Sequence, residues 1–193
     1  MGVLIVAALA AAPGPLSVSP EPADAAEQYR VWASSKGASG EAAEVACREL
    51  AGQGPKLCLR VEDEERRRYV TRADLAAWGL THAEAEAAAV EVLTASPWEL
   101  RELDGGGSWW EIPVNDVSAL AALAHPRWFP GDLVAMPSRS TLLAWRSDGG
   151  ELDHIMLVAV RRAYEAADDP VSPVVLRWGD SSWGVFGQAR PAE

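Results

Sequence analysis

The sequence predicts an α+β fold, a single domain of helices packed on antiparallel sheet built from hairpins. Short amphipathic helical segments alternate with pairs of short strand-like segments joined by tight turns. We find no succession of long hydrophobic strands separated by helices, which is the pattern of a parallel sheet. The 193 residues are 49% hydrophobic and 23% charged, as in folded domains, and one domain or one domain plus a tail is expected at this length.

The N-terminal forty residues are expected to precede the folded domain. Residues 2–12 form an apolar run that is too short for a membrane span of about 20 residues but suits the core of a secretory signal. No Lys or Arg occurs before Arg30. Residues 1–25 are therefore either a signal peptide, cleaved before Ala26, or a disordered Ala/Pro-rich tail. The location stays open between an exported, periplasmic protein and a cytoplasmic one, and no transmembrane span is predicted.

The domain is expected over residues 41–187, after a flexible Ser- and Gly-containing lead-in at 26–40 and before a tail at 188–193. Helical spacing of Ala and Leu predicts a helix from Gly40 to Ala51. Strands at 57–61 and 68–70 flank a charged turn and form a hairpin.

Two short helices should follow this hairpin. Thr71 is an N-cap for a helical turn that stops at Gly79, and Thr81 with Glu84 has capping-box spacing for a second helix. The remaining predicted elements are strands at 98–103 and 109–112, a helix at 117–124, strands at 133–136 and 140–146, a long helix between Leu152 and Pro170, and strands at 174–178 and 183–186. The apolar stripe of the long helix comprises Leu152, Ile155, Met156, Ala159 and Ala163.

The charge balance excludes one broad class of function and favours another. Seventeen basic and 28 acidic side chains give a net charge of −11. Nucleic-acid binding draws on clustered Lys and Arg, so a generic nucleic-acid binder is excluded. An acidic surface instead steers a basic protein partner toward it. The nine Trp residues indicate either a Trp-rich core or aromatic surface anchors.

Cys47 and Cys58 are the two cysteines, and two readings of them stay open. In an oxidising compartment they would close a small disulfide loop. In a reducing compartment they are buried thiols, with Cys47 on the predicted helix and Cys58 in a strand, and we favour this reading.

No motif predicts catalysis, a metal or a cofactor. The three histidines are isolated from one another and from Cys at zinc-ligand spacing. Ser138, His154 and Asp180 contain the residue types of a hydrolytic triad, but the Gly-x-Ser-x-Gly elbow is absent. The acidic run 62–65 precedes three arginines and indicates a solvated hairpin tip. We therefore expect no catalytic residues, although enzyme activity is left undecided.

Six residues are candidates for binding. Arg139 lies in a predicted turn, where a guanidinium can grip a carboxylate or phosphate, and Trp178, Asp180 and Trp183 flank another turn. If both turns meet at one end of the sheet, they form a small recognition site; otherwise Arg139 is a structural ion-pair partner of Asp132 or Asp180. Adjacent strand residues face opposite sides, so one of the two remaining candidates, Trp109 and Trp110, is expected to be exposed or covered by another element.

Three segments together resemble the DUF1444 family of bacterial proteins, whose function is unknown. The segments are Tyr69–Leu80 with the Ala-rich helix reaching Val92-Leu93, Gly131–Arg139 followed by Leu142-Leu143, and Val171-Ser172-Pro173 with Arg177-Trp178. The chain departs from the family pattern at Ser140, where an acidic residue is frequent, and at Val92, where Asn is frequent. The resemblance implies an α+β domain, usually intracellular, and no established activity.

The function expected from these observations is a non-catalytic, acidic domain that binds another protein. The alternative is a small hydrolase or ligand-binding enzyme centred on the Pro137-Ser138-Arg139 turn with His154 and Asp180. The two differ in geometry, because an enzyme needs these groups in one cleft whereas a binding module needs an exposed apolar patch.

Overall fold

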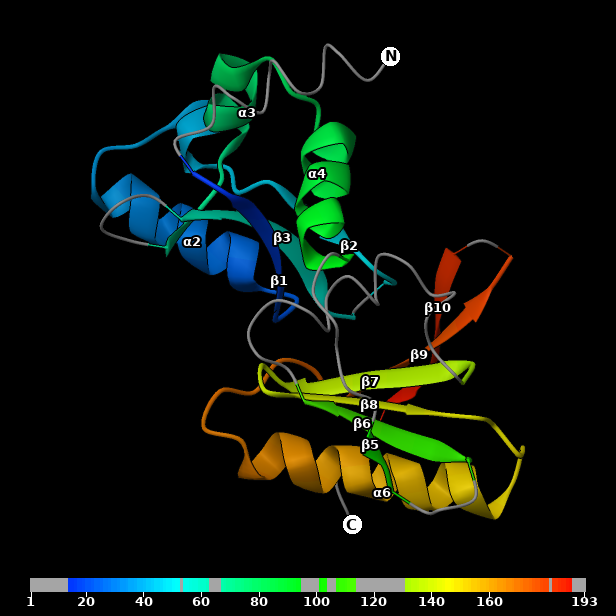
Figure 1. Ribbon diagram of the computed structural model, residues 1–193. Coiled ribbons are helices and arrows are strands. Elements are labelled where there is room, and N and C mark those ends of the chain that lie inside the picture. Colours follow the sequence, from blue (N-terminus) through cyan, green and yellow to red (C-terminus); the bar gives the residue numbers. More distant parts are fainter. Residues whose placement is uncertain are drawn as a thin grey trace.

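The protein is an α+β fold of two antiparallel sheets with helices, as the sequence predicts (Figure 1). The computed structural model describes residues 14–52, 54–62, 67–94, 101–103, 107–113, 131–180 and 182–188. One sheet has four strands and the other has six.

The four-stranded sheet is organised around β3 (Lys56–Glu62). One edge of β3 pairs with β1 (Leu16–Glu21). Along its other edge, β2 (Cys47–Glu49) pairs with the beginning of β3 and β4 (Arg67–Tyr69) with its end. The predicted hairpin across the charged turn is therefore present as β3 and β4.

The expectation that the folded domain begins at residue 41 is wrong, because β1 and the helix α2 (Ala25–Ser35) precede that residue. All six residues of β1 are buried, and Leu16 and Val18 belong to the main core. The strand tolerates Pro20 because β1 pairs on one side only within the described residues. Cleavage before Ala26 would remove this strand, and the lead-in expected at 26–40 is mostly helix.

The helix expected from Gly40 to Ala51 is also absent. A short 3₁₀ helix, η1 (Gly40–Ala43), is followed by extended chain and β2. The amide of Ala46 donates to the carbonyl of Val70, and the carbonyl of Ala46 accepts from the amide of Leu59. These long-range bonds satisfy the backbone better than an isolated helix of three turns, whose nucleation is costly.

The two predicted capped helices are α3 (Arg72–Trp78) and α4 (His82–Thr94). Thr71 caps α3 in a reciprocal box with Asp74, and Gly79 ends the helix in the left-handed conformation. The same box connects Thr81 and Glu84 at the start of α4. Ala85, Ala89 and Val90 of α4 pack into the core beside β1.

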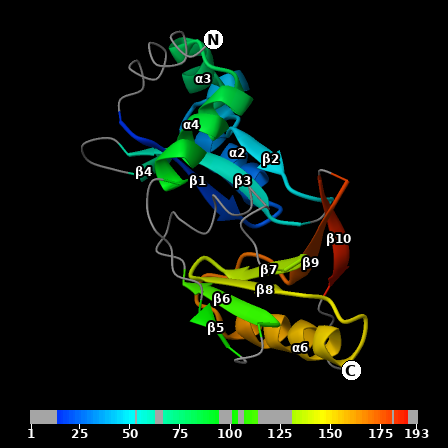
Figure 2. The ribbon, with the colours of Figure 1, turned by 45° about the vertical axis from the view of Figure 1, so that its right-hand side comes forward.

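The six-stranded sheet has the order β10-β9-β7-β8-β6-β5. Its strands are β5 (Arg101–Glu102), β6 (Trp109–Pro113), β7 (Leu133–Ser138), β8 (Thr141–Trp145), β9 (Val174–Gly179) and β10 (Ser182–Gln188). Helix α6 (Glu151–Ala166) covers one face (Figure 2). The predicted pairs β7–β8 and β9–β10 are confirmed. The predicted helix at 117–124 and the first part of the strand at 98–103 lie outside the described residues.

Two hydrophobic clusters hold these layers together. The larger combines β1, β3 and α4 with residues from one face of the six-stranded sheet, among them Val134, Met136, Leu176 and Trp183. The smaller lies between the other face and α6. Because the larger cluster is shared by both sheets, the sheets form one domain. Ile155, expected in the stripe of α6, is 51% exposed, and Val160 takes a buried position instead.

Candidate functional site

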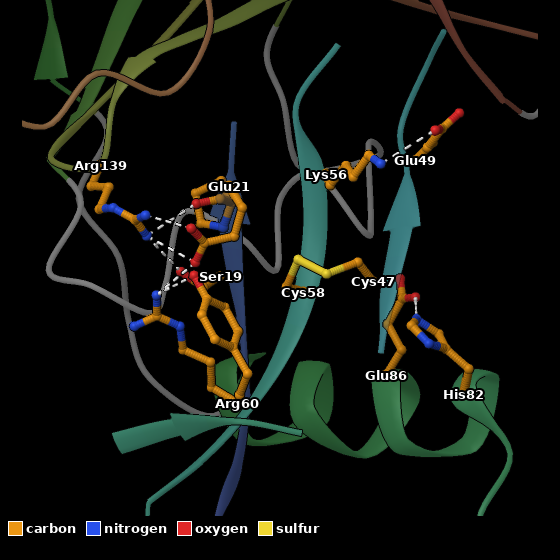
Figure 3. Close-up of a disulfide and its surroundings, with 12 residues drawn as sticks. Ser19, Glu21, Cys47, Glu49, Lys56, Cys58, Arg60, His82, Glu86 and Arg139 are labelled. Carbon is orange, nitrogen blue, oxygen red and sulfur yellow. Dashed lines mark hydrogen bonds and ion pairs between the residues drawn. A yellow bond between two sulfur atoms is a disulfide. The ribbon is translucent and has the colours of Figure 1, made fainter. Parts of the chain in front are cut away.

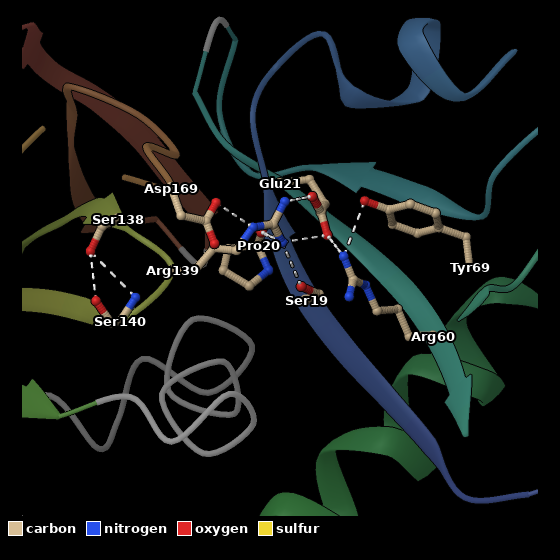
Figure 4. A network of polar contacts seen from close by, with 9 residues as sticks. All are labelled: Ser19, Pro20, Glu21, Arg60, Tyr69, Ser138, Arg139, Ser140 and Asp169. Carbon is tan, nitrogen blue, oxygen red and sulfur yellow. Dashed lines mark hydrogen bonds and ion pairs between the residues drawn. The ribbon is translucent and has the colours of Figure 1, made fainter. Parts of the chain in front are cut away.

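Arg139 is enclosed by an ion-pair network that joins the two sheets (Figure 4). Its Nη1 donates to Oε1 of Glu21 at 2.9 Å and its Nη2 donates to Oε2. Its Nε donates to Oδ1 of Asp169 at 2.8 Å. Arg60 Nη2 donates to the same Glu21 carboxylate at 2.6 Å and to the hydroxyl of Tyr69 at 3.2 Å. These five residues are called the Glu21 cluster below.

The electrostatics of the Glu21 cluster are those of a closed structural ion pair. Burial alone would raise the pKa of Glu21, but hydrogen bonding and charge from Arg139 and Arg60 outweigh it and lower the pKa. The hydrogen bond with Glu21 in turn raises the pKa of Arg139. The structural reading of Arg139 is therefore supported, but its partners are Glu21 and Asp169 rather than Asp132 or Asp180.

The two predicted site turns lie at opposite ends of the six-stranded sheet. Leu133 pairs with Arg177, so the turn after β9 lies beyond the first residue of β7, whereas Arg139 follows its last. Six residues of extended chain separate these ends by about 20 Å. The expected single recognition site is therefore not formed.

The hydrolase geometry fails for the same reason. Trp145, opposite Leu133 in the sheet, donates its Nε1 hydrogen to Asp153 at 3.0 Å. His154 is the next residue and is therefore near the Leu133 end of the sheet, far from Arg139. A cleft that contains Arg139, His154 and Asp180 together is not present.

Trp178, Asp180 and Trp183 do come together, at the β9–β10 turn. Trp178 pairs with Trp183 across the strands, and the rings meet edge to face with centroids 5.2 Å apart. Trp183 is 8% exposed and belongs to the core, whereas Trp178 is 36% exposed. Asp180 adopts a φ of 50°, which Asp tolerates in a tight turn. Val185 is 52% exposed. These four residues are called the hairpin corner.

Neither Trp109 nor Trp110 is an exposed anchor for a partner. Trp110 is 7% exposed, with the guanidinium of Arg146 5.7 Å from its ring centroid. Trp109 pairs with Trp145 and packs partly buried against the cluster beneath α6. The two rings face opposite sides and another element covers part of Trp109, as predicted.

Cys47 and Cys58 form a disulfide between β2 and β3, so the reading as buried thiols is wrong (Figure 3). They are directly opposite in the register, with Cα atoms 4.0 Å apart. The Leu59 amide donates to the Ala46 carbonyl, which makes this a non-hydrogen-bonded pair, where opposing side chains approach most closely.

Beside this disulfide lies a cavity of about 540 Å³. It is lined by β2 and the residues before it, by α3, and by the start of α4: Val45, Ala46, Cys47, Arg48, Arg72, Leu75, Ala76, Leu80 and His82. A smaller cavity of about 310 Å³ shares Val45, Cys47 and Arg72 with it.

A second ion-pair network borders the larger cavity. Arg48 donates Nε and Nη2 to the two oxygens of Glu86, at 3.0 and 2.6 Å. His82 Nε2 lies 3.4 Å from Glu86 Oε2, too far for a good hydrogen bond (Figure 3). Burial opposes ionisation of Glu86, but interactions with His82 and Arg48 lower its pKa to about 2. These three residues are called the Glu86 cluster.

Sequence reasoning missed the cavity residues. In the sequence, Arg48 follows a cysteine, and Arg72 and His82 each follow the threonine that caps a helix, so the neighbouring residue carries the recognisable signal. No spacing links them, because pairing of β2 with β3 and the packing of α3 bring them together. The described residues contain no group of His, Cys, Asp and Glu able to hold a metal, and no helix among them is long and apolar enough to cross a bilayer.

The chain was compared with protein-family models, curated proteins and solved structures, and none of the three gave a match.

Proposed function

We propose that this protein is a non-catalytic binding domain that docks a basic protein partner on the hairpin corner. The observation that carries the proposal is the exposed ring of Trp178 held edge-on by the buried ring of Trp183. Trp is the residue type most enriched at interface positions that dominate binding energy. A ring already fixed by packing loses little conformational freedom on binding.

The surroundings of Trp178 favour a cationic partner. Asp180 lies in the adjacent turn, and the Trp178 amide donates to the carbonyl of Asp132 at 3.2 Å. Asp132 is half-exposed, and its carboxylate lies 3.7 Å from Arg177. A Lys or Arg side chain of the partner would find the aromatic face of Trp178 with the Asp180 carboxylate in the adjacent turn, while Asp132 is already paired with Arg177. The net charge of −11 adds long-range attraction for a basic protein.

The strand beside Trp178 offers backbone groups as well. Within the described residues β10 pairs only with β9, and its segment Ser182–Gln188 carries no charged side chain and no Pro. Such an edge leaves N–H and C=O groups for an added strand. An extended basic segment is therefore the partner form that suits the corner best.

As part of the same proposal, the protein works in an oxidising compartment. The Cys47–Cys58 bond supports this, since disulfides persist outside reducing cytosol. The intact mass of protein from its native host, with and without reduction before alkylation, tests it. We expect the unreduced protein to have a mass two hydrogens lower than that of the dithiol form and not to react with the alkylating reagent. Alkylation of both cysteines without reduction would contradict the proposal.

The docking site is tested by photo-crosslinking from position 185. A photoreactive amino acid at Val185 should capture a protein in the native host, whereas the same group at Ile155, which is equally exposed on α6, should not. The captured protein, once identified and purified, should bind the wild type in calorimetry with strong salt dependence.

Trp178→Ala should then weaken that binding about 30-fold, in the range of a dominant interface residue, and Asp180→Asn should weaken it less. Ile155→Ala is the matched control and should leave the affinity unchanged. Equal capture at both positions, or an unchanged affinity for Trp178→Ala, would reject the hairpin corner as the docking site.

A further inference from the structure

We propose that the cavity beside the disulfide binds a carboxylate attached to an apolar chain. Its volume of about 540 Å³ lies within the range of small-molecule sites. It is separate from the hairpin corner and does not depend on the docking function.

The apolar part of the site consists of four buried residues and one exposed residue. Leu75 of α3 and Leu80, which follows it, are 6% and 7% exposed and belong to the main core. Val45 and Ala46 precede β2, and Ala76 completes the lining from α3. A chain of methylene groups or apolar side chains would exchange water for these walls.

The charged lining has one sign, in contrast to the protein as a whole. Among the described residues, Arg48, Arg72 and His82 are the titratable side chains that line the cavity, and no carboxylate residue lines it. The smaller cavity next to it is lined by both signs, with Glu27, Glu44 and Glu49 among the residues. Arg48 and Arg72 are paired with Glu86 and Glu44, so the groups left to attract an anion are the guanidinium N–H groups outside these pairs.

Arg48 is held in position from behind. Glu86 accepts from Nε and Nη2, which fixes the plane of the guanidinium and leaves Nη1 without an acceptor among the described residues. The low pKa of Glu86 keeps this support ionised at neutral pH. Arg72, whose Nε lies 3.2 Å from Glu44, is 66% exposed and can turn toward a ligand. Two guanidinium groups at the edge of an apolar cavity match a carboxylate head on an apolar body.

Two sources supply this chemistry: a medium-chain fatty acid, and the free C-terminus of an apolar peptide. The probes are decanoate and the peptide acetyl-Ala-Leu-Leu with a free carboxylate, titrated into the full chain by calorimetry. The corresponding primary amides are the matched neutral ligands. We expect at least one carboxylate to bind and its amide to bind about tenfold more weakly or not at all. Which of the two carboxylates binds identifies the source.

Two substitutions on exposed positions test the site without disturbing the core. Arg72→Gln should weaken carboxylate binding about tenfold while leaving the weaker binding of the amide unchanged. Ala76→Phe should fill the cavity and abolish binding. Arg101→Gln removes an arginine of similar exposure that pairs with Glu111 on the other sheet, and it should bind like the wild type.

Thermal unfolding of each variant confirms that it is folded. The proposal is overturned if neither carboxylate binds, if the amides bind as tightly as the acids, or if Ala76→Phe binds like the wild type.

Discussion

The Glu21 and Glu86 clusters have the same ingredients and opposite consequences. Each is a poorly exposed glutamate held by an arginine through two hydrogen bonds, with a second basic group beside it. In the Glu21 cluster the arginine also bonds Asp169, Ser19 and Pro20, and it closes the junction between two sheets. In the Glu86 cluster the arginine borders a cavity and retains donors. The two clusters therefore differ in whether every guanidinium nitrogen of the arginine has an acceptor, as in Arg139. This difference, rather than the depth at which the glutamate is buried, separates a structural ion pair from a candidate binding group.

The largest effect should come from removing the carboxylate charge of the Glu21 cluster. Glu21→Gln leaves Arg139 and Arg60 without their shared carboxylate in a poorly hydrated site. We expect a loss of about 3–5 kcal/mol in the free energy of unfolding, measured by denaturant titration. Glu27→Gln, in the exposed pair with Arg30, should leave stability nearly unchanged. A small loss for Glu21→Gln would mean that the cluster is solvated and that the contrast between the two networks is false.

The next largest effect concerns the disulfide beside the Glu86 cluster. The disulfide fixes the residue next to Arg48 and spans a sequence separation of 11. Replacing both cysteines by Ala should lower the free energy of unfolding by about 3 kcal/mol. Addition of a reductant should lower the stability of the wild type by a similar amount and leave that of the double variant unchanged. A double variant as stable as the oxidised wild type would contradict this role.

The pH dependence of stability tests the contribution of ionised Glu86 in the Glu86 cluster. Because the pKa of Glu86 is about 2 in the folded protein and about 4.5 when unfolded, its contribution is fully present above pH 4.5. That contribution is lost as the pH falls from about 4.5 to about 2. The stability difference between wild type and Glu86→Gln should therefore shrink over this window, by about 2 kcal/mol after allowance for the exposure of Arg48. A difference that is constant with pH would show that Glu86 gains nothing from its ionised form.

The smallest effect on stability is expected at the edge of the cavity. Arg72 and Glu44 are both exposed, so Arg72→Gln should change the free energy of unfolding by less than about 1 kcal/mol. The same substitution should nevertheless reduce carboxylate binding. A larger loss of stability would assign Arg72 to the structural class with Arg139.

The sequence predicted the elements whose determinants are local. Thr71 with Asp74, Thr81 with Glu84 and the tight turn at Asp180 set their helices and hairpin through neighbours within a few residues. The strand Leu16–Glu21 was missed because Pro20 and two serines resemble a tail, and its burial depends on β3 about 40 residues later. The segment around Cys47 has helical spacing, but its hydrogen bonds come from β3 and Val70.

The residues of the candidate sites were likewise predicted where their contacts are local in sequence and missed where they are not. Trp178 and Trp183 are joined by one hairpin and were found from the sequence. Arg139 was also found, but its partner Glu21 was not, because 118 positions separate them. Arg48, Arg72 and His82 come from three segments, and no local pattern relates them.

The distance in sequence between Glu21 and Arg139 has a consequence during synthesis. Glu21 leaves the ribosome long before its partner, and at typical elongation rates of 5–20 residues per second the delay is on the order of ten seconds. Over that interval β1 has a charged residue to bury and no counterion for it on the second sheet. The first sheet therefore cannot complete its junction until the β7–β8 turn has emerged, so the last stage of folding is set by the second half of the chain.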